Sequence, residues 1–221
     1  MQRREFSFSA ASLAAATTVG VAALPVLAQA QAKPFQSGTD YLTLDRAALT
    51  EAPAGQIEVV EFFWYNCPHC NAFEPVFDAW VKKAPKDVSV RRTPVAFRAD
   101  FEPQQRLYFV LDALGKIEEL HKKVFYAIHV EKQTLNTAAQ IADWLEKQGV
   151  SKARFNELYN SFSVTTKVRK ATQLQEAYAV DGVPSLGIHG RYFTSGTQAG
   201  TLQRALQVTD ALIGQVRSKA R

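Results

Sequence analysis

The two cysteines of this chain lie three residues apart, in the segment Cys67-Pro68-His69-Cys70. A thiol pair at this spacing can close a disulfide, and it can also exchange that disulfide with the thiols of another molecule. Such a short loop removes little chain entropy, so a purely structural disulfide would add little stability. The spacing therefore favours thiol–disulfide redox chemistry.

Two metal-centred alternatives fit these residues less well. A haem attachment site needs a histidine directly after the second cysteine, where this chain has Asn71. A zinc site needs two more ligands. The remaining histidines are isolated along the chain: His121, His129 and His189. We therefore expect no metal and no cofactor other than the redox-active disulfide Cys67–Cys70.

The cysteines stand where a strand should give way to a helix. Residues 57–65 form a nearly unbroken run of β-branched and aromatic side chains, typical of a strand buried on both faces. Apolar residues then recur at helical spacing over 73–84. Cys67 is therefore expected at the helix N-cap, where free backbone N–H groups and the helix dipole favour a thiolate.

The two residues between the cysteines support the same assignment. Pro68 suits the first helical position, where its missing N–H leaves no bond unmade. His69 can add a positive charge or a hydrogen bond beside the Cys67 sulfur. Together these effects should lower the pKa of Cys67 and make it the reactive thiol. Cys70 lies one turn further on and should be more buried and protonated.

The remaining pattern predicts a β-α-β unit, a block of helices and a closing β-β-α unit. The second strand is expected over 88–97, with Pro94 at an edge or a bulge. Helices should follow from about 101 to 178, with a capping box at Thr137 and Gln140. Two hairpin strands and a terminal helix complete the order, at 185–189, 191–194 and 202–216.

The first 32 residues resemble an export signal. Arg3 and Arg4 precede a mostly apolar run over 6–27, and small residues at 28–32 offer two Ala-Gln-Ala cleavage motifs. This pattern predicts a signal peptide over 1–32 rather than a membrane anchor. The arginine pair also resembles a twin-arginine signal, so the export route stays open. An irregular lead-in is expected over 33–56.

Composition places the chain among soluble globular proteins. Hydrophobic residues make up 47% and charged residues 21%, which excludes a disordered chain or a fibrous rod. The formal charge of +5 comes from 26 basic against 21 acidic residues, spread along the chain. Nucleic-acid binding would need a denser basic patch.

Two segments resemble the DsbA family of periplasmic thiol:disulfide oxidoreductases, within the thioredoxin superfamily. The first is EFFWYNCPHC at 61–70 with Phe73 and Glu74 after it. The second joins Gly-Val-Pro at 182–184 to His-Gly-Arg-Tyr at 189–192. The resemblance covers residues 40–219. It implies an α/β thioredoxin fold with an inserted helical domain, in which the thioredoxin part takes about 33–100 and 172–221 and the insertion takes about 101–171.

The resemblance also assigns auxiliary residues. It implies a cis Val183–Pro184 bond beside the dithiol, which leaves the Val183 backbone free to pair with an extended substrate segment. Glu61 matches a buried acid near the dithiol, facing Arg92 where the best-known members have lysine. Glu74 matches another family acid. From the residues alone, Glu61 could be a strand-edge charge and Glu74 a surface carboxylate favoured by the helix dipole.

The function so implied is a dithiol oxidase of the periplasm. It would donate the Cys67–Cys70 disulfide to exported proteins with reduced cysteines and be reoxidised by a DsbB-like inner-membrane quinone reductase. We expect a monomer that binds no nucleic acid. Two alternatives remain: an isomerase or reductase, which the short lead-in at 33–56 disfavours, and a chaperone-like peptide binder whose dithiol is vestigial.

Overall fold

The computed structural model describes residues 34–219. The expected signal peptide over 1–32 lies outside these residues. The predicted order of strands and helices is confirmed, with ends that differ by a few residues. In chain order the elements are β1 (Leu42–Thr43), β2 (Ile57–Phe63), α1 (Pro68–Val81), β3 (Val88–Pro94), a 3-10 turn (Ala99–Phe101), α2 (Glu102–Ala113), α3 (Ile117–His129), α4 (Ala138–Lys147), α5 (Lys152–Tyr159), α6 (Phe162–Ala177), β4 (Ser185–Ile188), β5 (Tyr192–Ser195), α7 (Gly196–Ala199) and α8 (Leu202–Lys219).

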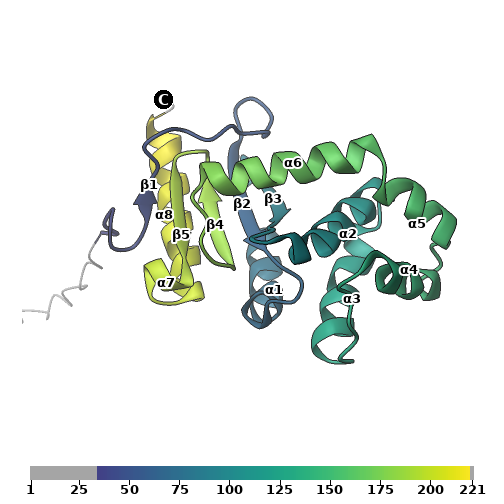
Figure 1. The fold of residues 1–221 in the computed structure, drawn as a ribbon. Helices are drawn as coiled ribbons and strands as arrows, with labels where there is room; N and C mark the ends of the chain where they lie inside the picture. Colours follow the sequence, from purple (N-terminus) through teal and green to yellow (C-terminus); the bar gives the residue numbers. More distant parts are fainter. Residues whose placement is uncertain (1–33, 220–221) are drawn as a thin grey trace, which may run out of the picture. The chain divides into compact units, whose positions relative to one another are not determined.

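Five strands form one mixed sheet in the order β1-β5-β4-β2-β3 (Figure 1). The central strand β2 runs parallel to β3 and antiparallel to β4. Every residue of β2 is buried, as its nearly unbroken apolar run predicts. Pro94 ends β3 on the edge of the sheet, where its missing N–H breaks no ladder bond, and this confirms its expected place.

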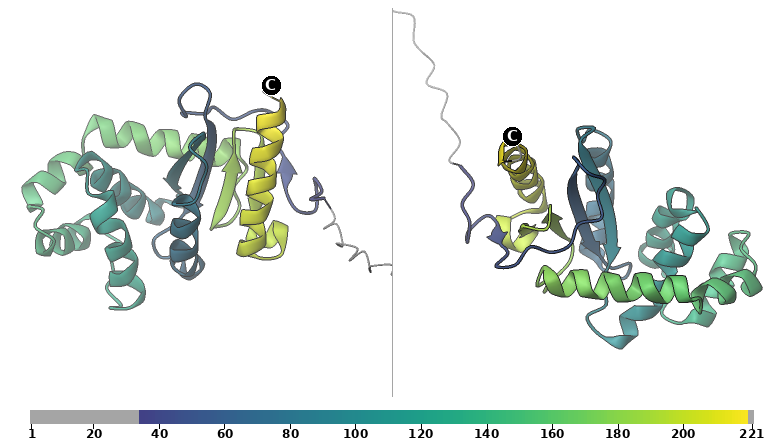
Figure 2. Two further views of the ribbon diagram at one scale, coloured as in Figure 1. Left: turned by 180° about the vertical axis from the view of Figure 1, so that it is seen from behind. Right: turned by 90° about the horizontal axis from the view of Figure 1, so that it is seen from above.

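Helices cover both faces of the sheet (Figure 2). On one face α1 and α8 pack on the sheet, and Val59 of β2 shares a core with Phe73 and Phe77 of α1. On the other face Phe62 of β2 meets Tyr178, directly after α6, in an edge-on ring contact. Alternate β2 side chains therefore enter different cores, which is why the strand needs apolar residues at nearly every position.

The helical block between β3 and β4 is an insertion with a core of its own. Helices α2 to α5 and the first part of α6 build this core, and Tyr65, Cys67 and Cys70 reach into it from the end of β2 and the start of α1. The result is an α/β thioredoxin fold with a helical insertion. The domain boundary expected at about 171 remains a prediction, since α6 runs through that position without interruption.

Three local expectations are wrong. The lead-in is not wholly irregular, because Leu42 and Thr43 form β1 by pairing with Phe193 and Tyr192 of β5. A two-residue strand has no periodicity, so only its partner defines it. The sequence favours a start of α6 at Ser163, but the helix begins at Phe162, capped by the Ser161 hydroxyl, and the short helix α7 was not expected. Within residues 34–219, no helix is both long enough and apolar enough to cross a membrane.

Candidate active site

Cys67 is the N-cap of α1, as predicted. Its backbone is extended (φ −78°, ψ 116°), Pro68 takes the first helical position, and the Cys67 Sγ accepts the backbone N–H of Cys70 at 3.3 Å. Both thiols are free in this structure. The side chain of Cys67 is therefore held where the unpaired N–H groups of the helix start converge.

The pKa values of the two thiols diverge. The pKa of Cys67 falls to about 6, chiefly because the Cys70 thiol donates a hydrogen bond to its sulfur. The backbone N–H groups of Cys70 and His69 and the charge of His69 lower it further, whereas burial of Cys67 opposes the shift. The pKa of Cys70 is raised far above its usual value, mainly by burial and then by the neighbouring Cys67. Cys70 is 1% exposed against 7% for Cys67. The expected ranking of burial and of pKa between the two thiols therefore appears in the structure.

Val183 and Pro184 lie against this dithiol although they are more than a hundred residues away in sequence. The Cys67 Sγ is 3.4 Å from the Val183 carbonyl oxygen, and the Val183–Pro184 bond is cis, as the resemblance implied. A shallow groove of about 390 Å³ opens beside them. It is lined largely by small and polar residues: His69, Asp181, Gly182, Val183, Pro184, Ser195, Gly196, Thr197, Gly200, Thr201 and Leu202.

A buried cluster of charges adjoins the dithiol. Glu61 is 1% exposed and stands opposite Arg92 in the β2–β3 ladder, with Arg92 Nε 3.1 Å from Glu61 Oε2. The other arm of Arg92 donates to Glu74 Oε1 at 2.9 Å. Burial raises the pKa of Glu61 to about 8 against the opposing effect of Arg92, and the nearby Glu74 raises it further. Burial, helped by the neighbouring carboxylate of Glu74, thus keeps a proton on Glu61 at neutral pH.

This cluster settles two alternatives. Glu61 is not a strand-edge charge, because its strand β2 lies inside the sheet and pairs with β4 on one side and β3 on the other. Glu74 is not a surface carboxylate, because it is 5% exposed and bound on two sides. Its second contact is His121, whose Nε2 lies 3.4 Å from Glu74 Oε2. When Glu61 is ionised, its charge raises the pKa of Cys70 further, so the cluster and the dithiol are coupled electrostatically.

The family model of the DSBA-like thioredoxin domain matches residues 58–207. A thiol:disulfide interchange protein DsbA from Burkholderia cepacia is 43% identical over 193 residues, covering 87% of this chain and 91% of the relative. A DsbA from Pseudomonas aeruginosa is 37% identical over 211 residues, covering 96% of each. The chain belongs to the DsbA family.

The similarity extends to the fold of the DsbA family. A crystal structure of Pseudomonas aeruginosa DsbA superposes with a TM-score of 0.79 at 38% identity, covering 84% of this chain and 96% of that one. The match spans the thioredoxin part and the insertion together. This DsbA-family chain is accordingly a protein disulfide oxidoreductase.

Sequence reasoning missed several residues of the DsbA-type site. His121 and His129 are isolated along the sequence, yet both contact Tyr65, two residues before Cys67. Gln104 and Asn136 contact Asn66, the residue directly before Cys67. A polar residue inside a helical apolar stripe, such as Gln104 in α2, was the one signal available. It is 2% exposed, and a buried amide requires partners.

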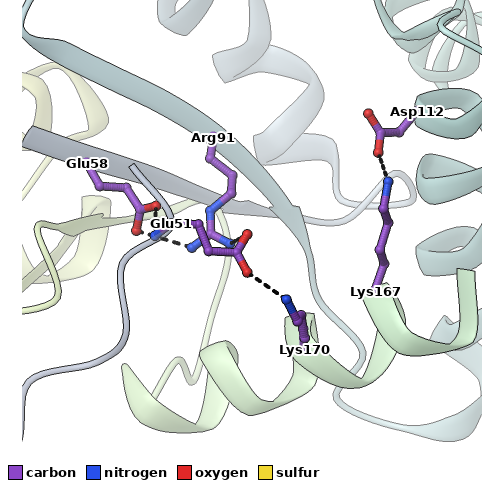
Figure 3. Close-up of polar contacts among 6 residues, drawn as sticks. All are labelled: Glu51, Glu58, Arg91, Asp112, Lys167 and Lys170. Carbon is purple, nitrogen blue, oxygen red and sulfur yellow. Dashed lines mark hydrogen bonds and ion pairs between the residues drawn. The ribbon is translucent and has the colours of Figure 1, made fainter. Parts of the chain in front are cut away.

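A second charged cluster lies at the other end of β2, away from the dithiol (Figure 3). Glu58, near the start of β2, is 1% exposed and accepts from Arg91 Nη2 at 3.2 Å and from the backbone N–H of Glu51 at 2.9 Å. Arg91 also binds Glu51, which meets Lys170 of α6 at 3.3 Å. These pairs tie the lead-in loop to the sheet and to α6, which is a structural role.

Proposed function

We propose that this oxidoreductase oxidises cysteine pairs of exported proteins by donating the Cys67–Cys70 disulfide. The observation that carries the proposal is the divergence of the two thiols. Cys67 has a pKa of about 6 at a helix N-cap, whereas Cys70 is buried with a raised pKa. A stable Cys67 thiolate favours the reduced form of the enzyme and makes Cys67 a good leaving group from a mixed disulfide, so the enzyme readily passes its disulfide on.

The first step is attack by a substrate thiolate on the Cys67 Sγ. A bond forms between the two sulfurs, the Cys67–Cys70 bond breaks, and Cys70 leaves with the electron pair. The raised pKa of Cys70 means that this sulfur must take up a proton. Glu61, with a pKa of about 8, is protonated at neutral pH and electrostatically coupled to Cys70. We assign Glu61 as the group that supplies this proton. Arg92 lowers the pKa of Glu61 and Glu74 raises it, so these two residues help to set that pKa.

The second step resolves the mixed disulfide. A second substrate thiolate attacks the substrate sulfur bonded to Cys67, so that the substrate disulfide forms and Cys67 departs as a thiolate. Two electrons have then passed from substrate to enzyme. The N-cap stabilises the departing Cys67, and His69 adds its charge there.

Substrate segments would lie in the groove beside the dithiol. The groove is lined by His69, Val183 and Pro184, and its many small side chains leave backbone accessible. An extended peptide could pair with the Val183 backbone in the manner of an added strand. Recognition through backbone suits an enzyme that must accept many sequences around a substrate cysteine.

We further assign the enzyme to the periplasm, after removal of residues 1–32, because the sequence there has the pattern of a secretory signal. An oxidising compartment is where a disulfide donor works. Reoxidation would come from a DsbB-like quinone reductase of the inner membrane. We expect a monomer with no cofactor beyond the Cys67–Cys70 disulfide.

The redox potential of the purified protein, measured against glutathione, tests the proposal. A donor should be much more oxidising than a thioredoxin-like reductase at about −270 mV. A value near that reductase range would favour the reductase alternative. A Cys67→Ala variant that kept full activity in a protein-folding assay would favour the chaperone-like alternative, in which the dithiol is vestigial.

A further inference from the structure

The turn that leads into the dithiol is held from outside the thioredoxin part. Residues 64–67 form a turn closed by the Cys67 N–H donating to the Trp64 carbonyl at 3.1 Å. Its two central residues are Tyr65 and Asn66. Among residues 34–219, the hydrogen bonds of the Tyr65 carbonyl and hydroxyl and of the Asn66 N–H and amide all go to the helical insertion.

Helix α3 holds Tyr65 at two points. His129 Nε2 donates to the Tyr65 carbonyl oxygen at 2.7 Å. The Tyr65 hydroxyl lies 2.8 Å from His121 Nδ1. Because the Glu74 carboxylate facing His121 Nε2 can only accept, the ring proton belongs on Nε2, and Nδ1 accepts from the Tyr65 hydroxyl. One contact fixes the backbone of Tyr65, and the other fixes its ring.

Helix α2 and the loop after α3 hold Asn66. Gln104 of α2 uses both ends of its amide: its Oε1 accepts the Asn66 N–H at 3.2 Å, and its Nε2 donates to Asn66 Oδ1 at 2.8 Å. The Asn66 amide donates in turn to Asn136 Oδ1 at 2.8 Å. Gln104 is 2% exposed, so these bonds are not readily replaced by water.

From these contacts we infer that the helical insertion acts as a clamp that positions Cys67, through His121, His129, Gln104 and Asn136. The inference deepens the proposed function and rests on Cys67 being its reactive thiol. The N-cap geometry of Cys67 depends on the chain direction entering α1, and that direction is set by the turn at 64–67. The four clamp residues are positioning residues, because their hydrogen bonds go to Tyr65 and Asn66, whereas the Cys67 Sγ bonds to Val183 and Cys70.

The clamp explains how a domain inserted more than thirty residues later can tune the thiol. If the turn relaxes, the Cys67 Sγ moves relative to the Cys70 N–H, at 3.3 Å in this structure, and the thiolate loses part of its stabilisation. The expected consequence is a higher Cys67 pKa and a slower attack on disulfides at neutral pH. A clamp with only a structural role would change the melting temperature and leave this pKa unchanged.

The test is a pH titration of the Cys67 thiolate by its ultraviolet absorbance in the full-length reduced protein. We expect Gln104→Leu and His129→Leu each to raise the Cys67 pKa by about 1, because a relaxed turn would weaken the hydrogen bond from the Cys70 N–H to the Cys67 Sγ. His129→Gln should keep the Cys67 pKa close to its wild-type value, because the glutamine amide nitrogen can donate in place of Nε2. Tyr65→Phe should give a smaller rise.

Two matched controls separate positioning from stability. Phe155→Leu weakens the same insertion core, where Phe155 is fully buried, without touching the turn. Tyr178→Phe removes a buried hydroxyl that accepts the Gly190 N–H on the other face of the sheet. Both should lower the melting temperature and leave the Cys67 pKa unchanged.

An unchanged pKa in folded His129→Leu and Gln104→Leu would overturn the clamp, as would an equal rise in Phe155→Leu. If Gln104→Leu does not fold, the comparison of His129→Leu with His129→Gln, at a half-buried position, tests the clamp by itself. The titration involves no substrate and no oxidant. A protein that proved to be a reductase could therefore still pass it, and the two proposals fail separately.

Discussion

Arg92 and Glu61 face each other across the parallel strands β2 and β3, with Arg92 Nε 3.1 Å from Glu61 Oε2. Arginine keeps its proton at any accessible pH, so it can neutralise Glu61 but cannot relay a proton. The same guanidinium also holds Glu74. The mobile proton of this cluster therefore belongs to the carboxyl groups, and the raised pKa of Glu61 places it there.

Glu61→Gln should leave the fold intact and slow the redox cycle, because Gln cannot exchange a proton with Cys70. It should also change how stability depends on pH. The folded pKa of Glu61 is about 8, above its usual value of 4.5, so the folded state binds the extra proton between these values. Stability of the wild type then falls as pH rises from about 4.5 to 8, by an upper bound of roughly 3 kcal/mol at pH 7.

Denaturant unfolding of the wild type and Glu61→Gln across pH 4 to 9 measures this slope, and stopped-flow assays measure the rates. The variant should have the flatter profile. Unchanged rates of both substrate oxidation and reoxidation would make Glu61 purely structural.

The two thiols should react with iodoacetamide at different rates. In the reduced protein Cys67 should be labelled at mildly acidic pH with a midpoint at about 6, while Cys70 is spared by its burial and raised pKa. Peptide mapping by mass spectrometry reads both sites. A Cys70→Ala variant should still be labelled at Cys67 but with a higher midpoint, because the thiol that donates to Cys67 is gone. Equal labelling of both cysteines would refute the assignment.

Reduction of the disulfide should change stability in a pH-dependent way. The disulfide contributes about 2 kcal/mol on the chain-entropy estimate for so short a loop. Against it stands the Cys67 thiolate, whose folded pKa is depressed from an unfolded value near ~8.5 to about 6. This contribution is complete above the unfolded value, partial between the two, and lost as pH falls through the folded value.

At pH 7 the thiolate contributes roughly 1.4 kcal/mol, so the two forms should be close in stability. For the two forms to be equally stable at pH 7, the folded pKa of Cys67 would have to be near ~5.6. With a folded pKa of about 6, the reduced form becomes the more stable one above roughly pH 7.5. Below pH 5 the oxidised form should be the more stable. Melting curves of both forms at pH 5, 7 and 8.5 test the crossing. An oxidised form that stayed the more stable at pH 8.5 would argue against an oxidising dithiol.

Arg91→Met should destabilise the protein by roughly 3 kcal/mol at pH 7, because the Glu58 side chain is 2% exposed and would lose its cation. Lys170→Met removes an exposed partner of Glu51 from the same cluster and should change stability by less than about 1 kcal/mol. Urea unfolding of both variants makes the comparison, and similar losses would show that Glu58 does not depend on Arg91.

The N-cap position of Cys67 could be predicted from the sequence because its signals are local. Cys67 follows a strand of apolar residues, and Pro68 starts the helix. These residues lie within one turn of the sulfur, so chain connectivity alone places them together. The helix order and the Thr137–Gln140 capping box are local in the same way, and the structure has both bonds of that box.

What surrounds the thiol was decided by tertiary packing. Glu74 looked like a surface acid until α3 covered it, and His121 and His129 looked isolated until that helix lay beside Tyr65. These partners are separated by dozens of residues, and nothing in the local sequence specifies which of many polar groups will meet. The buried apolar surfaces bring the insertion against the end of β2, and a buried polar group must then find its partner there. The sequence by itself therefore determined which sulfur lies at the helix N-cap, and only the packing of the insertion decided which side chains surround it.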